Sequence, residues 1–239
     1  MREAARTLPA WRSILAVVAH PDDESFGLGA VISTCIGLGI PVDVLCLTHG
    51  EASTLHGREG DLAVLRAAEL RTAGEALGVR TIRLLEHPDG ALGTVDLDRL
   101  TQEVIDVATE QGTDALLVFD DTGVTGHPDH MRATQAATAA AHALDVDVLA
   151  WTLPEAVAEP LRSEFGAGFA GRDPDDVDIV IAVDRARQRQ AVECHPSQAV
   201  PGSALWRRLD LLGDVEHLRW LRRSDDRARR HPSTAAGAP

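Results

Sequence analysis

The sequence predicts an α/β fold of the Rossmann-like kind, with an open, mainly parallel sheet and helices on both faces of that sheet. Short apolar runs rich in Val, Ile and Leu alternate along the chain with segments of helical periodicity. The apolar runs are nearly unbroken, which is typical of strands that helices cover on both sides. Strands and helices that alternate in this order form a parallel sheet through right-handed crossovers.

The first half of the chain contains three predicted strands, each followed by a helix. β-Branched and aliphatic residues place the strands at 13–19, 42–48 and 81–85. Apolar residues that return every three or four positions place the helices at 27–38, 62–77 and about 100–111. We interpret 49–60 as a solvated connection rather than a lid, and 86–90 as a turn, because Pro-Asp-Gly is itself a turn signal.

The second half continues the alternation of strands and helices. Further strands are predicted at 115–119, 146–151 and 177–183, and further helices at 131–144 and 185–192, with a short helix or insertion at 154–165. The basic segment 219–230 is interpreted as a solvated helical face rather than a contact for an anionic partner. No linker divides the chain, so we expect one domain over 1–239, with 1–11 and 232–239 disordered.

The composition excludes several classes of protein. The formal net charge of −14 argues against nucleic acid or an anionic membrane as the main partner. No apolar run approaches the length of a membrane span. Three scattered cysteines and no secretion signal indicate a reducing compartment, and hence the cytoplasm. All 23 basic residues are Arg and there is no Tyr, which excludes a Schiff-base lysine and a tyrosine acid. The composition is compatible with a homo-oligomer.

Two polar clusters follow two of the predicted strands directly. His20-Pro21-Asp22-Asp23-Glu24 ends the first strand, and Gly126-His127-Pro128-Asp129-His130 follows the fourth. Either cluster alone could be a helix N-terminus, where Pro and acidic residues are common. In the commonest doubly wound order, however, the first and fourth strands are neighbours where the winding reverses, and ligands bind at that point. Two unrelated helix caps would have no reason to meet there, so the pair predicts one shared site.

The residue types in the two clusters are those of a catalytic metal site. His20, Asp23 and His130 form a set of two imidazoles and one carboxylate, and three protein ligands with open positions are typical of a catalytic rather than a structural metal. Zn²⁺ is the first candidate. The same ligand set also serves non-haem Fe²⁺, so the sequence leaves the metal open.

The residues left over in the clusters suit the hydrolysis of an amide. A Zn²⁺ ion lowers the pKa of coordinated water to about 7, and Asp22 could take the proton from that water. His127 would lie across the substrate carbonyl, where it could stabilise the oxyanion and protonate the leaving amine. Asp129 could hold His127 in one tautomer and keep it charged.

The motif Ala19-His20-Pro21-Asp22-Asp23-Glu24, together with the second cluster, resembles the LmbE-like, or PIG-L, family of zinc-dependent N-acetylglucosaminyl deacetylases. The likeness runs from about residue 13 to 198 and also takes in Thr48-His49-Gly50-Glu51, Arg66 with Glu69, and His195-Pro196-Ser197-Gln198. It implies zinc on the three ligands, Asp22 as base, and removal of an acetyl group from an N-acetylglucosamine-type sugar conjugate.

The resemblance also implies residues that contact the sugar. It gives Arg66 a role in sugar recognition, although an exposed Arg66–Glu69 ion pair is the plainer interpretation of that helix face. We place Glu51 in the substrate site as well. The motif with His195 and Gln198 either closes the pocket and contacts the substrate, or Gln198 only bonds the backbone; the sequence favours neither. Thr125 occupies the position where the mycothiol-pathway deacetylase carries a Tyr oxyanion donor. This difference argues against assigning the substrate of that pathway to this chain.

Two other classes of protein stay open. A Rossmann-like sugar or nucleotide binding module could hold a structural ion without turnover, although no Gly-x-Gly-x-x-Gly follows the first strand. A facial-triad Fe²⁺ oxygenase would use the same three ligands. Such oxygenases usually have a double-stranded β-helix, which the predicted α/β pattern does not resemble.

Overall fold

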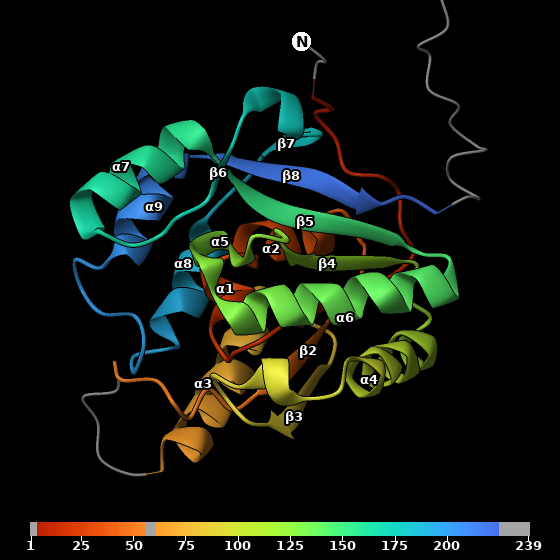
Figure 1. Ribbon diagram of the computed structural model, residues 1–239. Helices are drawn as coiled ribbons and strands as arrows, with labels where there is room; N and C mark the ends of the chain where they lie inside the picture. Colours follow the sequence, from red (N-terminus) through yellow and green to blue (C-terminus); the bar gives the residue numbers. More distant parts are fainter. Residues whose placement is uncertain (1–3, 56–60, 225–239) are drawn as a thin grey trace, which may run out of the picture.

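The computed structural model describes residues 4–55 and 61–224 of the chain. Within them one sheet has the strand order β3-β2-β1-β4-β5-β8-β7, with β6 paired to β5 at one side (Figure 1). The strands are β1 Ile14–Val18, β2 Val42–Thr48, β3 Ile82–His87, β4 Ala115–Phe119, β5 Asp147–Pro154, β6 Gly171–Arg172, β7 Ile179–Ala182 and β8 Val215–Arg222. The five strands from β3 to β5 are parallel, and β8 runs antiparallel to both β5 and β7.

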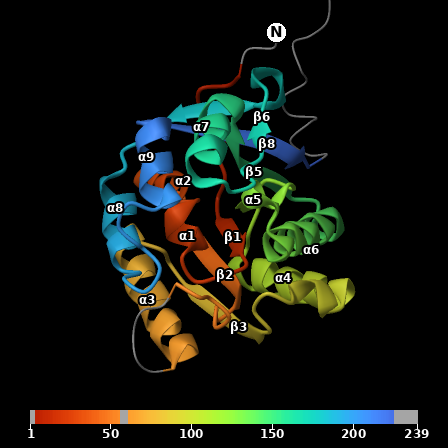
Figure 2. The same cartoon turned by 60° about the vertical axis from the view of Figure 1, so that its left-hand side comes forward.

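Helices pack on both faces of the sheet (Figures 1 and 2). The helices are α1 Asp23–Phe26, α2 Gly29–Gly37, α3 Leu62–Leu77, α4 Leu97–Gln111, α5 Gly123–Gly126, α6 Pro128–Leu144, α7 Glu155–Phe165, α8 Ala186–Glu193 and α9 Ala204–Leu212, with 3₁₀ turns at Leu92–Thr94 and Pro174–Asp176. The predicted fold class, a mainly parallel sheet between helices, is confirmed.

Strand β1 shows why the apolar runs have no polar interruptions. Its residues alternate between two hydrophobic clusters, because successive side chains of a strand point to opposite faces. Ile14 and Ala16 pack with the α2 and α3 side, which includes Ile32 and Leu70. Leu15 and Val17 pack with the α4 and α6 side. Both faces of the strand are therefore buried, as the sequence predicts.

Strand β1 lies between β2 and β4, with Ile14 opposite Ala115 and Ala16 opposite Leu117. The chain leaves β1 toward α1 and α2 on one face, and leaves β4 toward α6 on the other (Figure 2). The winding therefore reverses between these two strands. Their carboxyl ends bring the two polar clusters to the same edge of the sheet, as predicted.

The predicted helix at 27–38 corresponds to α2, and the separate short helix α1 precedes it. One expectation about secondary structure is wrong. The segment interpreted as a basic helical face forms strand β8 up to Arg222, because its buried Glu216 and Leu218 alternate with less buried residues at the period of a strand. Residues 225–230 of that segment lie outside the described residues.

The expectation of disorder at the amino terminus fails for two of its residues. Ala5 forms a bridge with Ile179 at the edge of the sheet. Trp11 is buried, and its Nε1 donates to Asp147 Oδ2 at 2.8 Å. Residues 1–3 and 232–239 lie outside the described residues. In 4–55 and 61–224, no helix has both the length and the apolar character needed to cross a bilayer.

Candidate metal centre and active site

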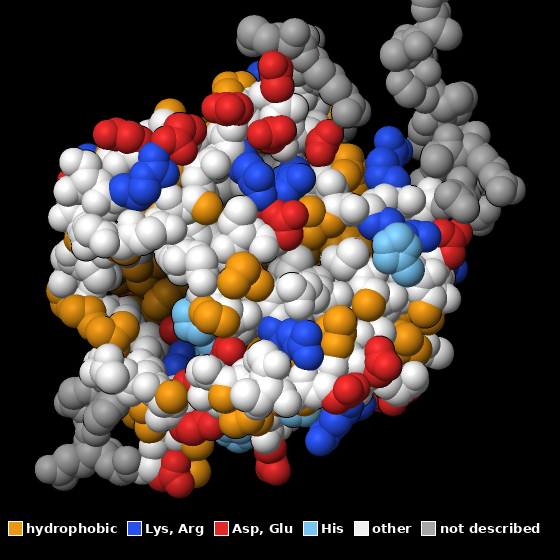
Figure 3. All heavy atoms as spheres, in the orientation of Figure 1, with side chains coloured by type: hydrophobic (Ala, Val, Ile, Leu, Met, Phe, Trp, Pro, Cys, Tyr) orange, Lys and Arg blue, Asp and Glu red, His pale blue; other side chains and the backbone are white. Residues whose placement is uncertain are grey.

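A pocket of ≈ 570 Å³ opens beside the carboxyl ends of β1 and β4. Figure 3 shows it as a hollow on the left of the face drawn, with hydrophobic side chains inside and histidine at its rim. The chain has only four Phe, and three of them line this pocket together with Trp151: Phe26, Phe119 and Phe169. The other wall carries charged and imidazole groups: His20, Asp22, Asp23, Arg66, His127 and His130.

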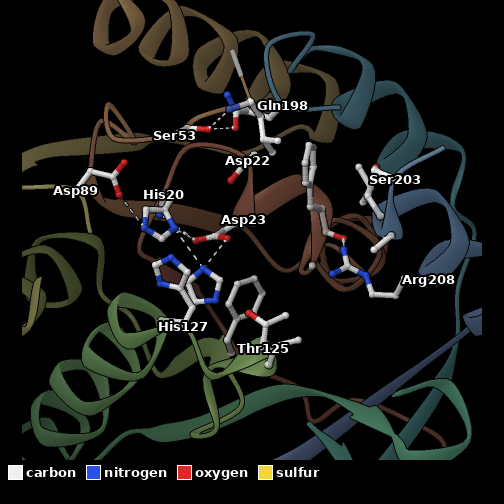
Figure 4. Close-up of a pocket in the computed structure, with 18 of the residues that line it drawn as sticks. His20, Asp22, Asp23, Ser53, Asp89, Thr125, His127, Gln198, Ser203 and Arg208 are labelled. Carbon is white, nitrogen blue, oxygen red and sulfur yellow. Dashed lines mark hydrogen bonds and ion pairs between the residues drawn. The ribbon is translucent and has the colours of Figure 1, made fainter. Parts of the chain in front are cut away.

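His20, Asp23 and His130 converge in this pocket. Figure 4 shows His20 and Asp23 side by side there. The Nδ1 atom of His20 lies 3.2 Å from Nε2 of His130 and 3.5 Å from Oδ2 of Asp23. The Nε2 atom of His130 lies 3.2 Å from Oδ1 of Asp23. Four ligands at about 2.05 Å around tetrahedral Zn²⁺ are about 3.3 Å apart, which is close to all three separations. The donor set therefore fits a divalent cation such as Zn²⁺.

Neighbouring groups turn each imidazole so that the other nitrogen is free for the ion. The Nδ1 atom of His130 lies 3.1 Å from the carbonyl of Gly123 and can only donate to it, which leaves a lone pair on Nε2. The Nε2 atom of His20 lies 3.1 Å from Asp89 Oδ1 and 3.4 Å from Asp129 Oδ2. Hydrogen bonds from metal-binding histidines to carboxylates or carbonyls commonly fix the ring in this way.

The carboxylates also make the site attractive to a cation. Burial alone would lower the pKa of His20, but hydrogen bonds to Asp129, Asp23 and Asp89 outweigh it and raise that pKa to about 12. Three carboxylates so close to one imidazole favour any positive charge at this point. A divalent cation would supply that charge without protonating the ligand.

Asp129 does not act on His127 as we expected. Its carboxylate accepts the backbone N–H groups of Gly90 at 2.8 Å and Leu92 at 3.0 Å, and it faces His20. It is the backbone N–H of Asp129 that donates to His127 Nδ1, at 3.2 Å. This bond fixes the neutral tautomer with the proton on Nε2.

The surroundings of His127 oppose the charge that we expected on it. Burial, followed by the neighbouring His130 and His20, lowers the pKa of His127 despite the opposing effect of Asp129. His127 therefore favours the neutral form, in which its Nε2–H is a hydrogen-bond donor.

Asp22 lies next to the ligand cluster in a strained backbone conformation. Its φ of 136° is rare for a residue other than glycine, and such outliers concentrate at active sites. Its backbone N–H donates to Glu24 Oε2 at 3.0 Å, and its carboxylate lies 3.0 Å from Arg66 Nη2. Burial raises the pKa of Asp22 to about 6, while the Arg66 charge opposes the rise. A carboxylate with such a pKa is a suitable proton acceptor near neutral pH.

The interpretation of Arg66 and Glu69 as an exposed ion pair is wrong, because both are buried and each has other partners. Arg66 donates to the carbonyls of Gly50 and Pro21, each at 2.5 Å, in addition to Asp22. Glu69 accepts the backbone N–H and the hydroxyl of Ser197, at 3.0 and 2.6 Å. Arg66 lines the pocket, but its contacts make it a positioning group for Asp22.

The residues expected to contact substrate divide into two groups. Gln198 and Thr125 line the pocket, and Gln198 Oε1 accepts the hydroxyl of Ser53 at 2.8 Å. His195 is fully buried and does not reach the pocket wall; its Nε2 lies 2.8 Å from Glu24 Oε1. The expected substrate contact by His195 is therefore wrong.

Glu51 is exposed and likewise does not line the pocket. Its carboxylate accepts the backbone N–H of Asp89 at 3.1 Å, so it supports the 86–90 turn instead of the substrate. That turn is itself part of the site, because the buried Asp89 carboxylate contacts His20. The sequence contained a signal for this contact, a third His-Pro-Asp, but we interpreted it as a turn alone. Sequence reasoning also missed Arg208, a pocket residue that belongs to no motif.

Comparisons with known proteins show the family to which the chain belongs. The sequence model of the family PIG-L, described as GlcNAc-PI de-N-acetylase, matches residues 15–141. A protein of Salinispora arenicola named 1D-myo-inositol 2-acetamido-2-deoxy-α-D-glucopyranoside deacetylase is 30% identical over 84% of this chain and 80% of its own length. A protein of the same name from Acidothermus cellulolyticus is 31% identical over 80% of this chain and 81% of its own.

The fold is similar to that of solved structures with more than one activity. The A40926 pseudoaglycone deacetylase Dbv21 aligns with a TM-score of 0.69 and 21% identity, over 87% of this chain and 96% of its own. The hydratase GalB of Pseudomonas putida KT2440 aligns with a TM-score of 0.67 and 18% identity, over 88% and 96%. These two likenesses support the fold alone. The family match and the similarity to the Salinispora protein show more: the chain belongs to the PIG-L family.

Proposed function

We propose that this chain is a metal-dependent hydrolase that removes an acetyl group from the amide nitrogen of an N-acetylglucosamine-type sugar conjugate. The observation that carries the proposal is the convergence of His20, Asp23 and His130 in one pocket, with the Asp22 carboxylate beside them. The names of the curated relatives, which are deacetylases of an acetamido sugar linked to inositol, support the same reaction class.

His20, Asp23 and His130 would hold the metal, and we take Zn²⁺ as the ion, with Fe²⁺ as the alternative. When bound, the ion supplies Lewis acidity, which acidifies water and polarises the amide carbonyl. The α/β sheet counts against an Fe²⁺ oxygenase of the double-stranded β-helix type.

The chain's own residues then have distinct tasks. Asp22 takes one proton from the attacking water as its oxygen bonds to the carbonyl carbon. Asp22 next gives this proton to the nitrogen as the carbon–nitrogen bond breaks. A free amine and acetic acid leave, and the acid loses its remaining proton to solvent to become acetate. His127 donates its Nε2–H to the carbonyl oxygen as negative charge develops there. Arg66 keeps the carboxylate of Asp22 in place through their ion pair.

The finer assignments rest on position in the pocket and on composition. We propose that Gln198 and Thr125 contact the sugar, since both line the pocket within the described residues. We further propose that 1–239 acts as one domain and that it works in the cytoplasm, where its free cysteines Cys35, Cys46 and Cys194 would stay reduced. Assembly into a homo-oligomer stays a prediction.

A screen for free amine tests the proposal. The protein is stripped of metal with a chelator, reloaded with Zn²⁺ or Fe²⁺, and incubated with a set of N-acetylglucosamine glycosides. Release of primary amine together with equal acetate is the expected result. The competing binding module predicts saturable sugar binding by calorimetry without amine. Binding without release for every glycoside and both metals would exclude the hydrolase.

A further inference from the structure

The pocket has a second polar end, away from the metal-binding residues. Ser203 and Arg208 line it there, across the pocket from His20, Asp23 and His127 (Figure 4). Arg208 belongs to α9 and Ser203 precedes that helix, so both lie beyond residues 15–141, where the family model matches.

The half-buried Arg208 differs from the buried Arg66 and Arg185 in having no carboxylate partner within the described part of the chain. Arg66 pairs with Asp22 at 3.0 Å, and Arg185 with Glu216 at 2.5 Å. Arg208, in contrast, forms no direct ion pair with any acid in residues 4–55 and 61–224. Its Nη2 donates to the carbonyl of Phe26 at 2.6 Å, and its guanidinium carbon lies 5.1 Å from the centroid of the Trp151 ring.

These two contacts fix the guanidinium and leave most of its hydrogen-bonding capacity unused. The Nε atom is buried and has no acceptor. Among the described residues, the hydrogen bond of this guanidinium is the one from Nη2 to Phe26. The hydroxyl of Ser203 is likewise buried without a partner. Burial lowers the pKa of Arg208 to about 10, although the charge of Glu216 opposes this fall.

Such an arrangement is complementary to an anion. A guanidinium presents a planar fork of donors that matches a carboxylate or a phosphate, and these charge-assisted bonds are the strong ones. A chain with a net charge of −14 has acids to spare, yet none of the described ones is placed directly on this arginine. A ligand that carried a negative charge would supply the missing partner.

We propose that Arg208, with Ser203, binds an anionic group, a carboxylate or a phosphate, on the part of the substrate linked to the N-acetylated sugar. The inference rests on the proposed function, since it assumes that the acetamido group reaches the metal-binding end. The rest of such a substrate would extend along the apolar wall at Phe26 and Trp151 to the second end. Arg208 is then a specificity-determining residue for the reaction.

Matched substrates test this inference. The carboxypropyl glycoside of N-acetylglucosamine is compared with its carbamoylpropyl analogue, which has the same shape and no charge. The α-1-phosphate of the same sugar is compared with its methyl α-glycoside, so that the two pairs separate carboxylate from phosphate. Turnover by the zinc-loaded enzyme and calorimetric binding of the corresponding amine products are both measured, for wild type, Arg208→Gln, Arg208→Lys and Arg207→Gln.

Arg207 is the matched control, because it lies beside Arg208 on α9 and pairs with Glu164 at the surface. In at least one of the two pairs, we expect wild type and Arg207→Gln to favour the anionic glycoside over its neutral counterpart. The expected preference is about tenfold or more in kcat/KM and in product affinity. Arg208→Gln should lose this preference, and Arg208→Lys should keep part of it.

The inference is overturned if the wild-type enzyme turns over and binds the charged and neutral members of both pairs equally. This outcome is measured on the wild type alone, so it does not depend on whether the variants fold. Turnover of the neutral glycosides in that case would leave the proposed function intact. If instead no glycoside is deacetylated but product binding shows the Arg208-dependent preference, the proposed function fails and the anion site stands.

Discussion

The Nε2 atom of His195 lies 2.8 Å from Oε1 of Glu24, although 171 positions separate the two residues in the sequence. Both side chains are completely buried. The other carboxylate oxygen of Glu24 accepts the backbone N–H of Asp22, the residue with a φ of 136°. Burial alone would lower the pKa of His195, but Glu24 outweighs it and raises that pKa. The last motif of the chain thus supports the backbone of the proposed base.

Replacing His195 with Ala should lower the free energy of unfolding by about 3 kcal/mol, because Glu24 would stay buried without its partner. The loss should also reduce kcat more than it changes KM, since His195 does not reach the pocket. Denaturant titration and steady-state kinetics measure the two effects. His142→Ala, at an exposed position of α6, is the control and should change stability by less than about 0.5 kcal/mol. Equal stability of the two variants would refute the supporting role.

Gly50 should not tolerate a side chain. It has a φ of 68°, and a Cβ atom there would lie 2.1 Å from Nη1 of Arg66. Gly50→Ala should therefore displace Arg66 from Asp22 and lower kcat by about tenfold or more, since misplaced catalytic groups have effects of this size. Gly37→Ala is the matched control, because it is exposed and nothing lies within 4 Å of the new Cβ. A Gly50→Ala enzyme with the kcat of wild type would show that the Arg66 position does not matter.

Asp120 should make stability depend on pH at the acid side. Burial alone would raise its pKa, but hydrogen bonds from Arg172 and Thr122 outweigh it and hold the pKa below its usual range. The folded pKa is thus below the unfolded value of about 3.9, so the stabilisation is present above that value and is lost as pH falls through the folded pKa.

Asp120→Asn should therefore lower the free energy of unfolding by about 2 kcal/mol at pH 7. This difference between the two proteins should shrink as the pH falls below about 4. Urea titrations of both proteins from pH 7 to pH 3 measure the difference. Asp121→Asn is the neighbouring control, with a side chain that is 55% exposed, and it should have a small effect at every pH. A difference for Asp120→Asn that stays constant down to pH 3 would contradict the assignment.

Asp89 should tune the affinity for metal through His20. Its carboxylate lies 3.1 Å from His20 Nε2, and loss of such outer partners commonly weakens metal binding by about 10–100-fold. Competition with a chromophoric chelator measures the affinity of Asp89→Asn. The exposed Asp106→Asn on α4 serves for comparison and should bind as wild type does. Unchanged affinity in Asp89→Asn would place this carboxylate outside the metal site.

The sequence was sufficient where local pattern and topology act together. The strand order follows from right-handed crossovers, so the neighbouring positions of β1 and β4, and with them the convergence of His20 and His130, could be predicted. The segment that became β8 could not be predicted, since its antiparallel pairing with both β5 and β7 depends on long-range contacts and has no local signal.

The remaining differences have the same origin in long-range contacts. Asp89 lies in a turn whose Pro-Asp-Gly chemistry fully explains it locally, and only the folded chain places its carboxylate on His20. The pair of His195 with Glu24 and the place of Arg208 in the pocket wall join segments more than 170 positions apart. No periodicity or motif spacing encodes such pairs.

The central claim is that His20, Asp23 and His130 hold one divalent ion beside Asp22, which acts as the base. The most direct measurement is metal content by atomic spectrometry together with acetate release, on wild type, Asp22→Asn and His130→Ala. We expect about one Zn²⁺ per chain in wild type and Asp22→Asn, little in His130→Ala, and acetate from wild type alone. Full metal content in His130→Ala, or turnover by Asp22→Asn at the wild-type rate, would contradict the account.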